Sequence, residues 1–199
     1  MDEPVQVVMA VSSAQVQIPG YVVGAWDIDP LHTEIGFSVR HLMVSKVRGR
    51  FTRFEGSFVT APDPLDSSAT ATIDMTSIDT NNPVRDDDLR SSNFFEVDQY
   101  PQMTYQSTGV RMDGEDIVLD GDLTAHGVTR PIPLRVEVNG FGGDPYGNQR
   151  SGYTATATIN RSDYGLTFNV PLDGGGVMIG DRIDITIEVE GILRKADDQ

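Results

Sequence analysis

Three histidines are the side chains of this 199-residue sequence best suited to metal binding or proton transfer near neutral pH: His32, His41 and His126. Their spacing matches no zinc motif, and none stands beside a carboxylate pair in the sequence that would suggest a facial triad. The sequence has no cysteine, which excludes thiolate metal sites, thiol nucleophiles and disulfide frameworks. A histidine on a strand is more often structural than a ligand, so we expect no metal site.

His41 has the same parity as Phe37 and Val39, which we expect to face the interior of the protein. A polar group that faces a core must find a partner. His41 is therefore either a core histidine satisfied by the protein or a polar anchor for the head-group of a ligand.

The segment Arg85–Phe95 reads RDDDLRSSNFF and first suggests a calcium site. A calcium loop needs oxygens at alternating positions, a central glycine and a late glutamate. Here the acids are consecutive, and consecutive helix residues point about 100° apart. We predict a charged, solvated helix start with its acids at the positive end of the helix dipole. Phe94 and Phe95 would turn inward as a lid, and Arg90 would either contact a head-group or hold an aspartate.

The usual catalytic motifs are missing from the sequence. Gly175 and Gly180 have the spacing of a phosphate loop, but Asp181 takes the lysine position. There is no GxGxxG, GxSxG or HExxH motif. No pair of acids stands out for glycoside hydrolysis. These absences favour binding over catalysis, with no cofactor expected.

The composition bounds the class of partner. The net charge is −15, the hydrophobic content is 38%, and the acids are spread along the whole chain. Phosphate binding needs clustered Lys and Arg, so nucleic acid is disfavoured, as is electrostatic docking to an anionic membrane. Residues 1–20 read as a flexible leader without the basic start of a signal peptide, and no segment is long enough to span a bilayer. We expect a cytoplasmic protein, with periplasmic or secreted as the alternative, and a tail at 194–199.

Apolar residues recur with a period of two through most of the chain. The alternating runs are 35–39, 69–75, 117–125, 132–138, 153–159 and 183–189. This pattern is typical of half-buried antiparallel strands. The parity changes once between Phe51 and Phe54, which predicts a β-bulge near Thr52 and Arg53. The exception is 83–100, which begins at Pro83 and predicts one or two short helices.

About eight antiparallel strands can form a sandwich or a barrel, and alternation alone does not choose between them. Small inward residues such as Ala71, Gly121 and Ala155 could leave a lumen for one ligand or could interdigitate with large residues in a filled core. Parity gives the candidate lining residues of a lumen. They are Phe37, Val39, Phe51, Phe54, Phe58, Ile73, Met103, Tyr105, Leu119 and Ile159, with His41, Arg90, Phe94 and Phe95 as polar or lid contacts.

A series of motifs in a fixed order then resembles one family. The motifs are Trp26–Thr33 (WDIDPLHT), Phe37–Met43, Val47–Phe51, Ser77–Thr80, Arg85–Phe95, Tyr100–Pro101, Gly121–Thr124, His126–Thr129 and Ile159–Leu166. Together they are similar to YceI-like proteins, the polyisoprenoid-binding barrels, over roughly residues 21–193. The resemblance implies an all-β fold, an extended eight-stranded antiparallel lipocalin-like barrel with one or two short helices.

The same resemblance implies a non-catalytic carrier that holds a long isoprenoid chain, such as a polyprenyl phosphate or an isoprenoid quinone, in an apolar lumen. Two alternatives stay open: an enzyme acting on a similar lipid with His41 as acid or base, and a filled-barrel stress or interaction module. An exposed barrel edge or face could also pair two copies into a homodimer.

Overall fold

The computed structural model describes residues 16–173 and 175–195, so most of the expected leader and most of the expected tail lie outside the described residues. The elements, in chain order, are β1 (Gly24–Ile28), β2 (Glu34–His41), β3 (Ser45–Phe51), β4 (Phe54–Thr60), η1 (Pro64–Asp66), β5 (Ser68–Asp74), η2 (Met75–Ser77), β6 (Ile78–Asp79), α1 (Pro83–Arg90), β7 (Gln102–Asp113), β8 (Asp116–Ala125), β9 (Val128–Gly143), β10 (Gln149–Asn160), η3 (Arg161–Tyr164) and β11 (Ile179–Leu193).

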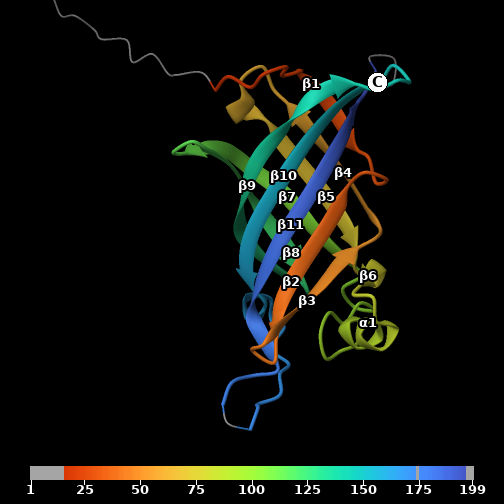
Figure 1. Ribbon diagram of the computed structural model, residues 1–199, viewed down its shortest axis with the longest axis vertical. Coiled ribbons are helices and arrows are strands. Elements are labelled where there is room, and N and C mark those ends of the chain that lie inside the picture. Colours follow the sequence, from red (N-terminus) through yellow and green to blue (C-terminus); the bar gives the residue numbers. More distant parts are fainter. Residues whose placement is uncertain (1–15, 174, 196–199) are drawn as a thin grey trace, which may run out of the picture.

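These strands form one closed antiparallel barrel with eight strand positions, which confirms the predicted fold class (Figure 1). Three of these positions are each filled by two short strands in succession: β1 with β2, β3 with β4, and β5 with β6. The barrel closes because β1 and β2 both pair with the long strand β11, β1 near its end and β2 near its start. The two short strands β1 and β2 together pair with β11 as one long strand would.

The change of parity between Phe51 and Phe54 is a break between strands rather than the predicted bulge. β3 ends at Phe51 and pairs with β2 and β6, whereas β4 begins at Phe54 and pairs with β1 and β5. Thr52 lies in the break, where its amide and its hydroxyl both donate to the carbonyl of Ser77, each at 3.2 Å. The position of the irregularity was predicted correctly, and only its form was wrong.

Large aromatic rings lie over glycines of other strands. A Cβ on Gly49 would stand 2.4 Å from the ring of Phe37, one on Gly121 the same distance from Tyr105, and one on Gly191 the same distance from Phe58. Any side chain at these glycines would push the rings into the lumen. The small residues therefore do pair with large ones, but along the wall, and the axis of the barrel stays open.

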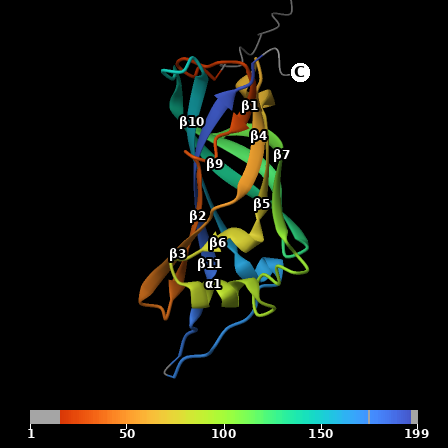
Figure 2. The same cartoon turned by 90° about the vertical axis from the view of Figure 1, so that its right-hand side faces the viewer.

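The helix α1 lies at the lower end of the barrel, to the lower right of the strands in Figure 1 and across that end in Figure 2. Asn82 caps it by accepting a hydrogen bond from the Arg85 amide, and Pro83 stands in its first turn. Leu89 packs on a core cluster that includes Phe51, Ile73 and Ile78. No helix in the described part of the chain is long and apolar enough to cross a membrane.

Candidate ligand-binding cavity

A cavity of about 960 Å³ runs through the barrel and is lined mostly by apolar side chains. This volume is near the upper end of the ~300–1,000 Å³ range of small-molecule sites. At the lower end its lining includes exposed residues at the start of α1, among them Asn82 and Val84, and at the upper end it includes Val59. The cavity therefore reaches the surface near both ends of the barrel.

Most of the residues expected at a lumen line this cavity. They are Phe37, Val39, His41, Phe51, Phe58, Ile73, Phe94, Phe95, Met103, Tyr105, Leu119 and Ile159. Phe54 is placed elsewhere and packs against the core cluster beneath α1. Strand parity placed the strand residues among them on the inner face, and Phe94 and Phe95, which follow the helix, line the cavity as well. Their contact with a ligand stays a prediction.

Arg90 does not line the cavity and instead fastens the helix to the barrel. Its Nε donates to the carbonyl of Thr76 at 3.0 Å, its Nη2 to the carbonyl of Ile78 at 3.0 Å, and its Nη1 to Asp87 at 2.9 Å. Of the two roles weighed for Arg90, these contacts support the structural one.

Asp86 is buried, which corrects the prediction that the acidic run is a solvated helix start. Its carboxylate accepts hydrogen bonds from the amide of Thr80 at 2.9 Å and from the Thr80 hydroxyl at 2.5 Å. Asp87 and Asp88 are exposed, as expected. The acidic run thus has one inward anchor and two outward charges.

Two hydroxyls near the upper part of the barrel were not expected from the sequence. Ser151 is 2% exposed, and neither its Oγ nor the hydroxyl of Tyr153 makes a geometrically sound hydrogen bond within the described residues. The ring of Tyr153 lines the cavity and packs edge-on against Phe58 and Phe141. Burial raises the pKa of Tyr153 to about 12, although the nearby Ser151 hydroxyl acts to lower it. A neutral donor without a partner beside an apolar cavity suits a ligand oxygen.

The three histidines have different neighbours and do not form one cluster. His41 lines the cavity where β2 ends. His126 lies in the turn after β8, where its Nδ1 is 3.0 Å from the carbonyl of Tyr164 and its ring packs on Tyr100. His32 follows β1, and its Nδ1 is 2.9 Å from Asp29 Oδ2.

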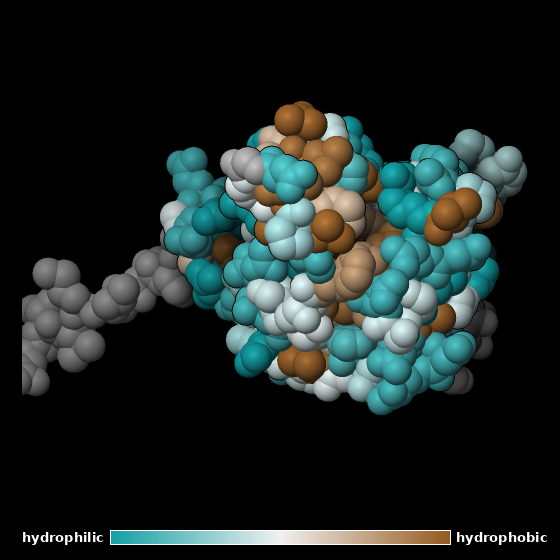
Figure 3. Space-filling view, turned by 90° about the horizontal axis from the view of Figure 1, so that it is seen from below, coloured by the Kyte–Doolittle hydropathy of each residue, from teal (hydrophilic) through white to brown (hydrophobic). Residues whose placement is uncertain are grey.

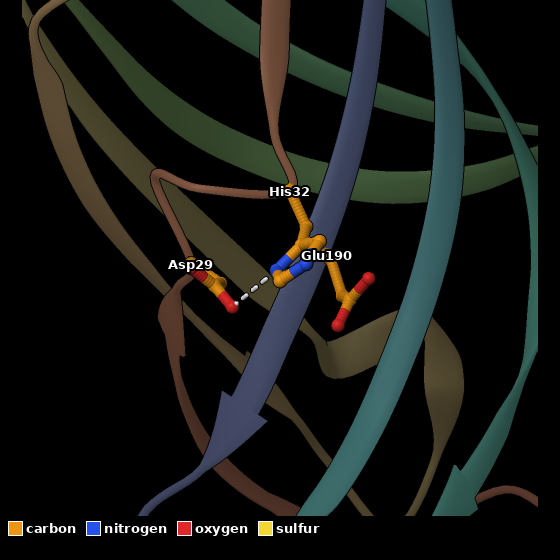
Figure 4. Close-up of side chains that lie close together, drawn as sticks. All are labelled: Asp29, His32 and Glu190. Carbon is orange, nitrogen blue, oxygen red and sulfur yellow. Dashed lines mark hydrogen bonds and ion pairs between the residues drawn. The ribbon is translucent and has the colours of Figure 1, made fainter. Parts of the chain in front are cut away.

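His32 does stand beside a carboxylate pair, contrary to the expectation from the sequence. Asp29, His32 and Glu190 offer ligand atoms within 4.8 Å of one another (Figure 4). Arg150 occupies the same place, because its Nη1 donates to Asp29 at 2.6 Å and to Glu190 at 2.5 Å. A guanidinium satisfies these carboxylates already, so the cluster is an ion-pair hub. The D-x-x-H spacing was visible in the sequence, but Arg150 lies 121 residues away from Asp29.

The sequence matches the family model of the YceI-like domain over residues 26–191. Protein YceI of Escherichia coli is 38% identical over 170 residues, which cover 85% of this chain and 86% of the relative. The crystal structure of the Campylobacter jejuni YceI protein is 27% identical with a TM-score of 0.64, covering 78% of this chain and 90% of that one.

A second solved structure, a polyisoprenoid-binding domain from Saccharophagus degradans, aligns with a TM-score of 0.65 at 19% identity. It covers 87% of this chain and all of its own. Likeness at this identity shows the fold. Together with the match over most of the chain, these comparisons confirm the predicted family: the protein belongs to the YceI-like family.

Proposed function

We propose that the protein is a carrier that holds a long isoprenoid chain in its barrel. The observation that carries this proposal is the continuous apolar cavity of about 960 Å³ along the lumen. The likeness to the Saccharophagus degradans polyisoprenoid-binding domain supports the ligand class, since the two barrels share the fold.

The apolar chain alone is enough to drive binding. Each methylene moved from water into the lumen contributes about 0.8 kcal/mol. For a chain of about 40 carbons the gross term is tens of kcal/mol, whereas observed affinities saturate near about −20 kcal/mol because ordering a flexible chain is costly. Polar contacts therefore set the orientation of the ligand more than the strength of binding.

The hydroxyls of Ser151 and Tyr153, which have no hydrogen-bond partner other than each other within the described residues, would be the site for such a polar contact. A quinone carbonyl or a polyprenyl oxygen beside them would satisfy a buried donor that otherwise costs about 1–3 kcal/mol. The two hydroxyls are neutral, and burial keeps Tyr153 protonated. They suit an uncharged oxygen better than a phosphate.

Two alternative functions, an enzyme and a filled-barrel module, predict different outcomes. The enzyme is tested by His41→Ala, and the module by whether the lumen is filled. An enzyme that uses His41 as acid or base would lose turnover of a lipid substrate when His41 becomes alanine. A carrier would show only a changed affinity. A filled-barrel module requires a closed lumen, and the open cavity disfavours this function.

The direct test compares two tryptophan substitutions on adjacent residues of β11. Ile185 lines the cavity, whereas Thr186 is exposed on the outer face. We expect Ile185→Trp to weaken binding of a polyprenol or isoprenoid quinone about tenfold or more by filling the lumen, and Thr186→Trp to leave it unchanged.

Binding would be followed by the fluorescence of protein from which any bound lipid has been removed. Thermal unfolding of both variants serves as the folding control. Equal affinity in the two folded variants would refute binding in the lumen.

A further inference from the structure

The turn between β2 and β3 exposes three consecutive apolar side chains. Leu42, Met43 and Val44 are 41%, 50% and 82% exposed. Turn positions normally carry Gly, Asn, Asp or Ser, and a run of exposed apolar residues is a fault unless it has a function.

The backbone of this turn makes the choice of residues more unusual. Leu42 and Met43 have φ of 50° and 62°, and the Val44 amide donates to the His41 carbonyl at 3.1 Å. Two central residues with positive φ characterise a type I′ turn, for which Asn-Gly is preferred. Leucine and methionine are strained there, and such strain persists mainly where it serves a function.

The hairpin also carries an unusual charge for this protein. Residues 35–54 contain five Lys and Arg and no Asp or Glu, in a chain whose net charge is −15. Arg40, Lys46, Arg48 and Arg50 are all exposed on β2 and β3 behind the apolar tip. Lys46 is paired with Asp184 and Arg50 with Asp79, whereas Arg40 and Arg48 have no carboxylate within 4.0 Å in the described part of the chain.

The tip lies at the lower end of the barrel, beside one opening of the cavity. His41 and Arg40, next to the turn, both line the cavity, and Leu42 is fixed to the neighbouring loop by its amide, which donates to Met178 at 2.8 Å. Phe168 and Val170 of that loop are exposed as well. From below, apolar side chains gather near the centre and at the edge of this face among hydrophilic ones (Figure 3).

We propose that the β2–β3 hairpin docks the lower end of the barrel onto an anionic lipid surface. The tip of Leu42, Met43 and Val44 would enter the interface between headgroups and acyl chains, and the basic residues behind it would face the lipid phosphates. Apolar burial combined with attraction to anionic lipid is how surface-bound segments hold a membrane. The expectation from net charge alone was the opposite, because it averaged over the whole chain.

Several acids at the same end oppose this attraction and set the orientation. Asp87 and Asp88 are exposed on α1, and Asp173 is exposed in the loop beside the tip. Asp184 already receives hydrogen bonds from both Lys46 and Arg182. The hairpin would therefore lead and α1 would tilt away from the surface, which leaves the cavity opening between them at the membrane.

The test is sedimentation of the full chain with vesicles of phosphatidylcholine, with or without phosphatidylglycerol, at low ionic strength. We expect binding only with the anionic lipid. Replacing the tip by Leu42→Asn with Met43→Gly should weaken it about tenfold or more, while the hairpin gains the residues its turn prefers. Arg40→Gln with Arg48→Gln should weaken it about 25-fold, roughly fivefold for each charge.

Two matched controls lie away from the hairpin. Tyr146→Ser removes an exposed aromatic ring from the β9–β10 turn, and Arg111→Gln removes a basic residue from β7. Both should bind as the unchanged protein does. Loss of binding in the tip variant with undiminished thermal stability supports the proposal. No binding of the unchanged protein to anionic vesicles, or equal binding by all variants, overturns it. The measurement needs no cavity ligand, so it succeeds or fails independently of the carrier function.

Discussion

At the scale of single residues, Arg150 joins parts of the chain that are far apart in sequence. Its guanidinium donates to Asp29, to Glu190 and to Asp144 at 2.5–2.9 Å. Asp29 precedes β2, Glu190 lies on β11, and Asp144 lies in the turn after β9. Asp29 and Asp144 are almost fully buried, so removing Arg150 would leave two buried carboxylates without a cation.

This hub predicts a specific dependence of stability on pH. Burial raises the pKa of Asp29, but hydrogen bonds from Arg150, His32 and the Leu31 amide outweigh it and lower the pKa from 3.8 to about 2. Asp29 therefore contributes stability that is present above about pH 4 and is lost as the pH falls toward about 2, in total about 2 kcal/mol.

Urea unfolding of the protein and of Asp29→Asn over that pH range tests this. The difference in their free energies of unfolding should shrink as the pH falls. Because Asp184 also has a pKa lowered to about 2 by Lys46 and Arg182, both proteins will lose some stability. A difference that stays constant with pH would contradict the role of Asp29.

The residues of the hub and the unpartnered hydroxyls were beyond sequence reasoning for one physical reason. Asp29 and Arg150 meet only because β1 and β10 both pair with β11 near the same end of the barrel. The tyrosines and serines of alternating strands all look alike in sequence, and only the fold shows that Ser151 and Tyr153 have no partner among the described residues.

At the scale of elements, α1 is attached to the barrel by polar contacts beneath it. Asp86 accepts from Thr80, Arg85 donates to the hydroxyl and carbonyl of Thr80 at 2.7 and 2.8 Å, and Arg90 donates to backbone carbonyls. Phe94 and Phe95, which follow the helix, line the cavity. The contacts that hold α1 therefore also position two side chains of the cavity lining.

Loosening α1 should speed the loss of a cavity ligand. Asp86→Ala removes a buried carboxylate that holds Thr80, which should cost about 2 kcal/mol of unfolding free energy and raise the dissociation rate of a bound lipid. Asp87→Ala is the matched control, because Asp87 is the exposed neighbour whose pairing with Arg90 should contribute less than about 1 kcal/mol. Chemical unfolding and stopped-flow release of a fluorescent lipid measure both effects. Equal release rates would contradict a lid.

Elements of this kind were largely predictable from local pattern. Strand alternation, Pro83 and the break near Thr52 are all signals of local backbone conformation, which neighbouring residues in the sequence determine. The burial of Asp86 was not predictable, because it depends on the helix being placed so that the Asp86 carboxylate meets the amide and hydroxyl of Thr80.

At the scale of the whole molecule, the choice between a sandwich and a hollow barrel was open to pattern reasoning and was decided by family resemblance. Alternation gives the face of each residue but not the curvature of the sheet. The lumen stays open because Phe37, Tyr105 and Phe58 lie over Gly49, Gly121 and Gly191, and these cross-strand pairings exist only once the register is fixed.

The most direct test of the carrier function is to purify the full chain from a host that makes isoprenoid lipids, extract it with organic solvent and identify the extract by mass spectrometry. We predict an isoprenoid-chain lipid recovered with the protein and with Thr186→Trp, and strongly reduced with Ile185→Trp. An extract with no such lipid, together with no fluorescence response of the protein to added polyprenols or isoprenoid quinones, would contradict the proposed function.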